Sequence, residues 1–356
     1  MRICLLYSPT GNGHRAAARA VEHALHAAAD DIRVDVLDVL RFAPASFRYD
    51  RWWELIQQRG GRLYDRLFDL SDAPHPVWRV AREQLNLRLL APLAAELERL
   101  QPDRIVCTHF LPAIAVAYLR RTRRLAAEVS VVITDYLAHQ AWLCPGIDRY
   151  YVATPGVAEQ LLARGIAGVE LAGIPIAAAM DESPTPPPDR RRVLLLAAGV
   201  PRALVREAVA SIPAGVDLEI VAGRDVPLRR ELAELRSGPV HGFVPGLRTM
   251  IDRADVVVTK AGGLIVTECL ARGRAMVMPW PAPGQERGNR AHAIAVGAAR
   301  ACEPSATGAT LVELPALAMG RAAAHAARRG AAARIAADLL ADHTEHAQPM
   351  RRSASS

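Results

Sequence analysis

Aromatic residues, lysine and long hydrophobic runs are all scarce in this sequence of 356 residues. Phenylalanine, tryptophan and tyrosine together make up 5% of it, and Lys260 is its only lysine. No apolar run approaches the roughly 18–20 residues that a membrane-spanning helix requires. We therefore expect that any membrane contact is peripheral.

Cysteines are few and widely separated. None of the five forms a CxxC pair or another metal-ligand spacing: Cys4, Cys107, Cys144, Cys269 and Cys302. A disulfide framework is not expected at this chain length, so we expect reduced, mostly buried thiols. The sequence opens with a predicted strand at residues 2–7 rather than with a signal peptide. We therefore expect a cytoplasmic protein.

Positive charge is in excess, with a formal net charge of +7 and a pI of about 9.5. Such a balance fits a nucleic acid, a membrane surface or an anionic substrate as partner. It also fits a genome that favours arginine, so charge alone does not choose among these classes.

Short apolar runs alternate with longer helical stretches, which is typical of parallel sheets covered by helices. The first half predicts strands at 2–7, 33–38, 105–108 and 129–134, with helices at 14–29 and 112–123. The second half predicts strands at 192–197, 218–222, near 240, 256–259 and 275–278, and helices at 202–211, 228–235, 264–272 and beyond 309. Prolines are dense between the halves, which favours an extended linker. We predict an N-terminal domain at 1–177, a linker at 178–190, a C-terminal domain at 191–342, and a disordered tail at 343–356.

A first glycine loop, Ser-Pro-Thr-Gly-Asn-Gly-His-Arg at 8–15, joins the first predicted strand to the first helix. Gly11, Asn12 and Gly13 suit backbone of positive φ. The loop is neither a Walker loop nor a full GxGxxG. His14 either caps the helix in a tight turn, or acts as a general base kept neutral by the helix N-terminus.

A second glycine loop follows the strand predicted at 256–259. Gly262 and Gly263 precede a helix, whose N-terminus suits a diphosphate if the backbone approaches a ligand there. Glu268 lies one turn into that helix, where a carboxylate could hold ribose hydroxyls. A polar loop is predicted at 281–289, with Gln285, Glu286 and Asn289 available to read sugar hydroxyls.

Together these motifs resemble glycosyltransferase family 28, and within it the monogalactosyldiacylglycerol synthases and bacterial diacylglycerol glucosyltransferases. Further matching segments are Val-Ile-Thr-Asp-Tyr at 132–136 with His139 and Trp142, and Gly-Ile-Pro at 173–175. The resemblance covers roughly residues 2–324. It implies the GT-B fold of the α/β class, in which two Rossmann-like doubly wound domains face each other across a cleft.

The resemblance also implies roles for individual residues. His14 would be the catalytic residue, Glu268 would hold the ribose, and the amides of Gly263, Leu264 and Ile265 would meet the diphosphate. Gln285 and Glu286 would bind the hexose, and Phe243 and Val244 would flank uracil. The remaining donor-side candidates are Gly199, Gly223, Lys260, Gly262 and Asn289. The remaining acceptor-side candidates are Gly11, Gly13, Asp135, His139 and Trp142. No metal or cofactor is implied, and the UDP-sugar is a substrate.

Two departures from the family pattern stand out. The first loop carries Gly11-Asn12-Gly13 where three consecutive glycines are usual, and residues 197–202, Ala-Ala-Gly-Val-Pro-Arg, replace a glycine-rich loop. The second departure leaves phosphate contacts from that loop unsupported.

Aromatic and basic side chains concentrate between residues 47 and 82, where three of the five tryptophans lie. Such a mixture favours the headgroup layer of anionic membranes. It also fits an amphipathic helix pair covering the sheet, or a nucleic-acid surface, although no recognition motif accompanies it. We favour the membrane, with an acceptor lipid entering from this side and no nucleic-acid partner.

The sequence therefore predicts an inverting hexosyltransferase that moves sugar from a UDP-hexose to a lipid such as diacylglycerol, on the inner face of the cell membrane. Three alternatives remain open. One is transfer to a polyprenyl-linked or soluble acceptor, and another is a sugar-nucleotide 2-epimerase. The third is a binding protein without catalytic power.

Overall fold

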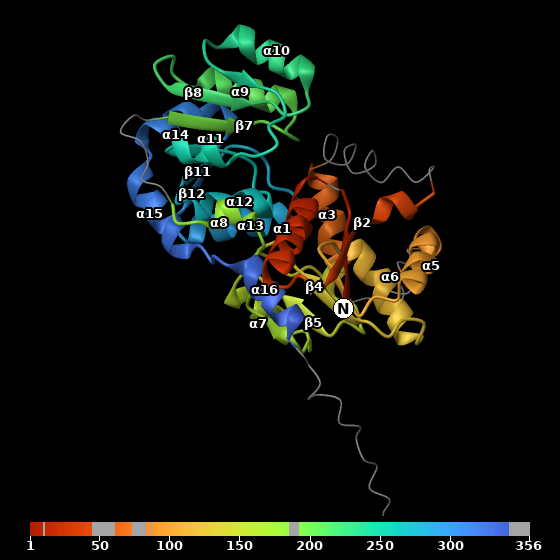
Figure 1. Ribbon diagram of the computed structural model, residues 1–356. Helices are drawn as coiled ribbons and strands as arrows, with labels where there is room; N and C mark the ends of the chain where they lie inside the picture. The colour runs from red at the N-terminus through yellow and green to blue at the C-terminus, as the bar shows by residue number, and fades with distance from the viewer. Residues whose placement is uncertain (10, 45–60, 73–82, 86, 185–191, 342–356) are drawn as a thin grey trace, which may run out of the picture.

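The computed structural model describes residues 1–9, 11–44, 61–72, 83–85, 87–184 and 192–341. Within these ranges the chain forms two six-stranded parallel sheets, one from each half of the sequence. Figure 1 shows both sheets flanked by helices, with the second half of the chain forming the upper lobe.

The first sheet has the strand order β2-β1-β3-β4-β5-β6. Its strands are β1 (Arg2–Tyr7), β2 (Arg33–Asp38), β3 (Arg104–Cys107), β4 (Glu128–Val132), β5 (Arg149–Tyr151) and β6 (Val169–Glu170). The order reverses at β1, between the neighbours β2 and β3. In such sheets ligands bind outside the carboxyl ends of the strands where the order reverses, so the loops after β1 and β3 mark the first place to search.

The second sheet has the order β12-β11-β10-β7-β8-β9. Its strands are β7 (Arg192–Leu196), β8 (Asp217–Val221), β9 (Val240–His241), β10 (Val256–Val258), β11 (Ala275–Met278) and β12 (Ala299–Ala301). Here the reversal lies between β7 and β10. The loops after these two strands therefore mark the second place to search.

Helices cover both faces of each sheet. Those of the first half are α1 (Gly13–Ala28), α3 (Gly61–Asp72), α5 (Ala91–Leu100), α6 (Phe110–Arg121), α7 (Pro155–Leu162) and α8 (Ala178–Asp181). Those of the second half are α9 (Arg202–Ser211), α10 (Val226–Leu235), α11 (Arg248–Arg253), α12 (Gly263–Ala271), α13 (Gln285–Ala295), α14 (Thr307–Glu313), α15 (Ala316–Ala326) and α16 (Ala331–Leu340). Short 3-10 turns lie at Val39–Phe42, Gln140–Trp142 and Pro304–Ala306.

Alternation along β1 shows why both faces need helices. Ile3 and Leu5 are fully buried on the side of α1, whereas Cys4 and Leu6 are fully buried on the side of α5 and α6. Because successive side chains of a strand point to opposite faces, a strand that is apolar throughout can be satisfied only between two helix layers.

The last helix crosses back to the first sheet. Ile335 and Leu339 of α16 are buried in the same core as Ile3 and Leu5, and the Tyr151 hydroxyl donates a hydrogen bond of 2.5 Å to Asp338. Figure 1 shows α16 beside α1. The sequence prediction placed these residues in the C-terminal domain. They pack on the first domain instead, because the apolar face of α16 fills the space next to α1.

The segment predicted as a polar loop at 281–289 is partly helical, because α13 begins at Gln285. Gly284 precedes it with φ of +59°, which glycine adopts without strain. Glycine and asparagine are poor helix formers, so Gly288 and Asn289 led to the prediction of a loop instead of a helix. Strands β5, β6 and β12 were also not predicted. They are two or three residues long.

Four of the five cysteines are buried and Cys302 is partly exposed, all of them as free thiols, in line with the prediction. The aromatic and basic residues at 47–59 and 78–82, the prolines at 186–188 and the tail at 343–356 lie outside the described residues.

Candidate functional site

The two glycine loops meet across the domain interface. A side chain added to Gly13, at the start of α1, would lie 3.6 Å from Leu264, at the start of α12. One loop follows β1 and the other follows β10, so both belong to the strand-end regions where the order of each sheet reverses. The contact places the two predicted halves of the site opposite each other.

His14 is oriented by the first sheet. Its Nδ1 lies 2.7 Å from the Thr108 carbonyl oxygen and 3.1 Å from the Thr134 hydroxyl. A carbonyl oxygen can only accept, so Nδ1 carries the proton and Nε2 keeps its lone pair. His14 therefore does not cap the helix, and its Nε2 is the nitrogen that could take a proton.

Burial keeps this imidazole neutral. It lowers the pKa of His14 to about 4, against the opposing effect of the Thr108 hydrogen bond. The ring of His109 lies edge-on at 4.5 Å between centroids and that of Trp142 at 6.4 Å. The pKa of His109 is also well below its usual range, chiefly because of burial. The sequence predicted a neutral His14 from the helix N-terminus, but loss of solvent is the main cause.

The N-terminus of α12 offers unused hydrogen-bond donors. The first hydrogen bond inside this helix runs from the Val266 amide to the Gly262 carbonyl, at 3.1 Å. Among the described residues, the amides of Gly263, Leu264 and Ile265 make no hydrogen bond. Free amides at a helix start attract anions, so this end of α12 can take a phosphate group.

Glu268 is a carboxylate without a protein partner in the described part of the chain. Its side chain is half-buried, and burial raises the pKa of Glu268 to about 7. A buried carboxylate is costly unless hydrogen bonds satisfy it. Glu268 therefore fits the predicted role of accepting bonds from ligand hydroxyls.

Lys260, in the loop after β10, lies between the loop after β7 and the start of α13. Its ammonium group lies 2.7 Å from Glu286, and its side chain runs beside Gly199, which has φ of +76° in the loop after β7. Glu286 is buried at the start of α13 with Gln285 before it. Lysine thus holds in place one of the two residues predicted to read the hexose.

The residues predicted to flank the uracil lie farther along the same edge of the second sheet. Phe243 is 48% exposed, with the Arg224 guanidinium 4.6 Å from the ring centroid. Val244 packs against the core beneath it, and Gly223 turns the loop after β8 with φ of +68°. One face of the Phe243 ring is therefore covered by arginine.

The structure gives the two glycine loops a different physical basis from the one predicted. A side chain on Gly263 would lie 2.0 Å from the Thr134 carbonyl oxygen, so this glycine admits the first domain rather than a ligand. Asn12 was expected to suit positive φ, but its φ is −86°. Positive φ in this loop falls on Gly11, at +78°.

Asn289, predicted on the side of the sugar donor, joins the two domains. Its side chain is fully buried, donates to Asp135 and to the Ala261 carbonyl at 3.0 Å each, and accepts from the Tyr136 amide at 2.7 Å. Both of its N–H groups are therefore used by protein acceptors. Asp135, predicted on the acceptor side, accepts one of these bonds through Oδ1, and burial raises its pKa to about 6.

His139, predicted on the acceptor side, makes hydrogen bonds within the first domain. Its Nε2 donates to the Phe68 carbonyl at 2.9 Å and its Nδ1 accepts from the Ala141 amide at 3.0 Å. Nε2 therefore holds α3, whereas Nδ1 caps the 3-10 turn at Gln140–Trp142. Trp142 is 3% exposed and forms part of the aromatic wall around His14.

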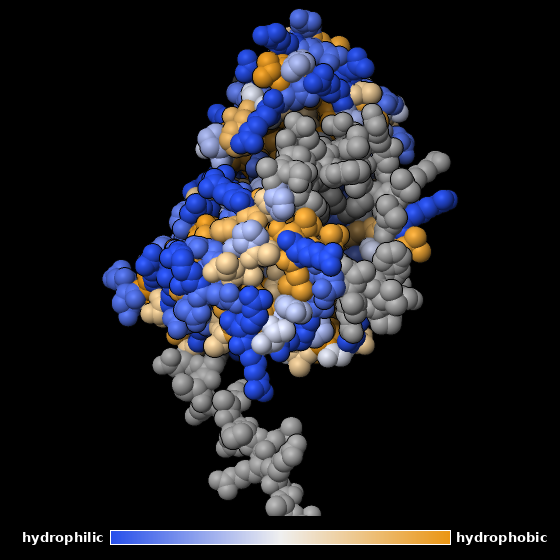
Figure 2. Space-filling view, turned by 90° about the vertical axis from the view of Figure 1, so that its right-hand side faces the viewer, coloured by the Kyte–Doolittle hydropathy of each residue, from blue (hydrophilic) through white to orange (hydrophobic). Residues whose placement is uncertain are grey.

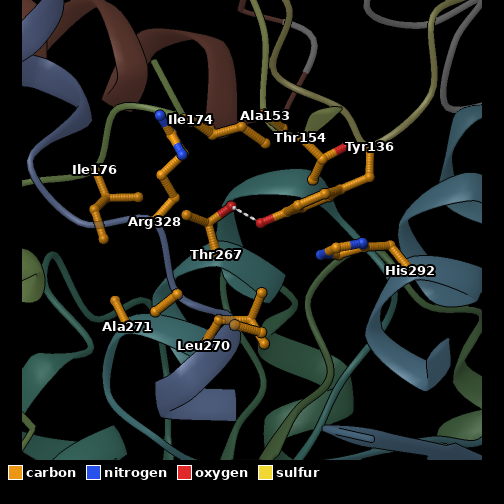
Figure 3. A pocket seen from close by; sticks show the side chains of 13 residues that line it. Tyr136, Ala153, Thr154, Ile174, Ile176, Thr267, Leu270, Ala271, His292 and Arg328 are labelled. Carbon is orange, nitrogen blue, oxygen red and sulfur yellow. Dashed lines mark hydrogen bonds between the residues drawn. The ribbon is translucent and has the colours of Figure 1, made fainter. Parts of the chain in front are cut away.

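Tyr136 and His292 were missed as interface residues. Their rings stack at 4.2 Å with an interplanar angle of 11°, and the Tyr136 hydroxyl lies 2.9 Å from that of Thr267. Figure 3 shows them lining a small cavity between the domains. Thr108 and His109 were missed as partners of His14. Their place directly after β3 was the available signal, because β3 neighbours β1.

In the residues that the structure places, no three His, Cys, Asp or Glu side chains gather as a metal site. None of the helices described is long and apolar enough to cross a membrane.

Comparisons with known proteins agree with the predicted resemblance. Residues 14–176 match the family model of monogalactosyldiacylglycerol (MGDG) synthase. A processive diacylglycerol beta-glucosyltransferase of Bacillus subtilis is 33% identical over 209 residues, which are 53% of this chain and 54% of that enzyme. An enzyme of the same name from Bacillus thuringiensis is 26% identical over 84% of this chain and 81% of its own. The first of these alignments thus spans about half the length of the curated relative. The resemblance to the diacylglycerol glycosyltransferase group of family 28 is confirmed.

Solved structures establish the fold. The glycosyltransferase SsfS6 of Streptomyces sp. SF2575, complexed with thymidine diphosphate, superposes with a TM-score of 0.63 at 17% identity, covering 96% of this chain and all of that chain. MurG of Acinetobacter baumannii gives a TM-score of 0.59 at 14% identity, covering 95% and 99%. At such identities the likeness concerns the fold alone, and it confirms the two-domain GT-B architecture.

Replacing Glu268 with glutamine should stabilise the protein at high pH. The folded-state pKa of Glu268 is raised, so ionisation weakens the fold as pH climbs from its unfolded value near 4.5 through about 7. We expect the variant to gain about 1–3 kcal/mol of unfolding free energy at pH 8 and nothing at pH 4.5, measured by urea denaturation. Exposed Glu234→Gln is the control, and an equal gain at both pH values would contradict the assignment.

Asn289→Ala should loosen the domain interface. The substitution removes three hydrogen bonds and leaves buried partners unsatisfied, which costs about 2–4 kcal/mol of unfolding free energy. We expect a lower denaturation midpoint together with a larger radius of gyration in X-ray scattering. Asn12→Ala is the matched control, because Asn12 makes no side-chain cap bond. An unchanged midpoint would show that the clamp contributes little.

Proposed function

We propose that this chain, which resembles the diacylglycerol glycosyltransferases of family 28, transfers a hexose from a UDP-sugar to the hydroxyl of a lipid such as diacylglycerol, with inversion of the anomeric centre. The observation that supports this most is the pairing of His14 with the start of α12. A neutral imidazole with a free Nε2 and a helix end with free amides belong to loops that touch through Gly13 and Leu264.

The donor would lie along the second sheet. Its diphosphate suits the amides of Gly263, Leu264 and Ile265, where the helix dipole favours negative charge. Glu268 would accept hydrogen bonds from the ribose hydroxyls. The exposed ring of Phe243 offers a stacking surface to the uracil.

The transferred hexose would lie near the first turn of α13. Gln285 and Glu286 have side chains suited to sugar hydroxyls, and Lys260 fixes the carboxylate of Glu286. A base held opposite the leaving group is the arrangement that inversion requires.

The chemical step would use His14 as base. As Nε2 removes the proton of the acceptor hydroxyl, its oxygen bonds to the anomeric carbon and the bond from that carbon to the phosphate oxygen breaks. UDP leaves with the bonding electron pair, and its added negative charge falls at the helix start. The Thr108 carbonyl, which already accepts from Nδ1, stabilises the imidazolium that forms.

A lipid acceptor is supported by the printed names of the relatives and by the surface near α3. Leu70 on that helix is 71% exposed. Figure 2 shows hydrophobic side chains gathered in the middle of the face on this side of the molecule. We propose a peripheral contact with the inner face of the cell membrane, at which diacylglycerol would enter.

The protein should release UDP from UDP-glucose or UDP-galactose only when diacylglycerol liposomes are present. The measurement is coupled UDP release, together with chromatography of extracted lipids. A glycolipid product would support the proposal. UDP release without glycolipid would favour a soluble acceptor, and free interconversion of sugars would favour an epimerase.

His14→Ala should reduce kcat about 100-fold or more while leaving the Kd of UDP within about twofold, because general base catalysis contributes factors of this order. In the unmodified protein, kcat should fall only as pH approaches the lowered pKa of His14, about 4, and should not fall near 6.5. His26→Ala, at an exposed position of α1, is the control. Loss of UDP binding in the His14 variant would reduce this residue to a structural role.

A further inference from the structure

Helix α3 is seated on the first domain by its C-terminal half. The Phe68 carbonyl accepts from His139 at 2.9 Å, and Asp72 accepts from the Gln140 amide at 2.7 Å and from Arg164 at 3.2 Å. His139 and Gln140 lie in the segment that follows β4, and Arg164 follows α7, so all three belong to the same domain as His14. The position of α3 is therefore tied to the acceptor side of the interface (Figure 1).

The same helix bonds to the second domain through two other aspartates. Asp65 accepts from the Gly284 amide at 2.7 Å, and Asp69 pairs with Arg287 at 2.5 Å. Residues four apart lie on one face of a helix, so Asp65 and Asp69 together face the start of α13. The two contacts bracket a very short stretch of chain.

That stretch is Gln285 and Glu286, the two residues proposed to bind the hexose. Gly284 immediately precedes α13 and Arg287 is its third residue. A carboxylate that accepts from an amide at a helix start is favoured by the helix dipole. Asp65 thus fixes the beginning of the first turn, and Asp69 fixes its far end.

The energetics favour positioning over stabilisation. The side chains of Asp69 and Arg287 are 57% and 48% exposed, and exposed ion pairs contribute little to stability. Each raises the other's preference for its charged form, since Arg287 lowers the pKa of Asp69 and Asp69 raises that of Arg287. Variants at these positions should therefore fold.

We propose that Asp65 and Asp69 are positioning residues that orient the first turn of α13 toward the transferred hexose, and so tie sugar recognition to the acceptor-side helix α3. The inference rests on the proposed function. It concerns the sugar and not the nucleotide, because neither aspartate contacts the start of α12 in the residues described. Loss of either aspartate should therefore weaken the binding of a UDP-sugar more than the binding of UDP.

Asp65→Ala and Asp69→Ala should each weaken binding of UDP-glucose about tenfold relative to the unmodified protein and leave the Kd of UDP within about twofold, by calorimetry. In the transfer assay kcat should fall about tenfold, as expected for a misplaced reacting group. The double exchange Asp69→Arg with Arg287→Asp should restore binding to within about threefold. Asp30→Ala, exposed at the end of α1, controls for lost charge.

Equal losses for UDP and UDP-glucose would overturn the inference, because they would indicate general disorder of the interface. No loss for either ligand would overturn it as well. A failed exchange with intact thermal stability would remove Asp69 from the pair. The proposed function fails separately, through the unmodified protein, if that protein binds no UDP or makes no glycolipid.

Discussion

The structure depends on a backbone contact between its two domains. The Thr134 carbonyl lies against the α-carbon of Gly263, at a distance that leaves no room for a side chain, and the buried Asn289 amide bonds both domains beside it. Close backbone approach needs glycine on one side, and buried polar groups need partners across the gap. Because these requirements are met together, the loop that carries His14 comes to lie against the start of α12 through Gly13 and Leu264.

The groups proposed for chemistry have environments that cost stability. Burial keeps His14 neutral and raises the pKa of Glu268, although Glu268 has no partner in the described chain. An unsatisfied half-buried carboxylate weakens the folded state, and natural proteins carry such groups where function requires them. The nearby Asn289 and Lys260, by contrast, are satisfied by protein atoms. Of these two, Asn289 bonds across the domain interface, whereas Lys260 pairs with Glu286 within the second domain.

Helix α3 connects the two kinds of group. Through Asp72 it is fixed to the domain of His14, and through Asp65 and Asp69 it meets the helix that carries Gln285 and Glu286. Sugar recognition and acceptor entry would thus share one structural element. Through this shared helix, the position of the sugar site would be coupled to that of the surface where the lipid enters.

The sequence by itself determined the alternation of strands and helices, the two glycine loops and the prominence of His14 and Glu268, because these follow from local hydrophobic pattern and from residue type. Only the tertiary structure decided that Asn289 and His139 hold the protein together, that Gly263 admits Thr134, and that α16 covers the first sheet. Each of these outcomes depends on residues far apart in the chain, more than 100 positions for Asn289, Gly263 and α16. Hydrogen-bonding capacity can be read from a residue's type, but its partner is set by packing.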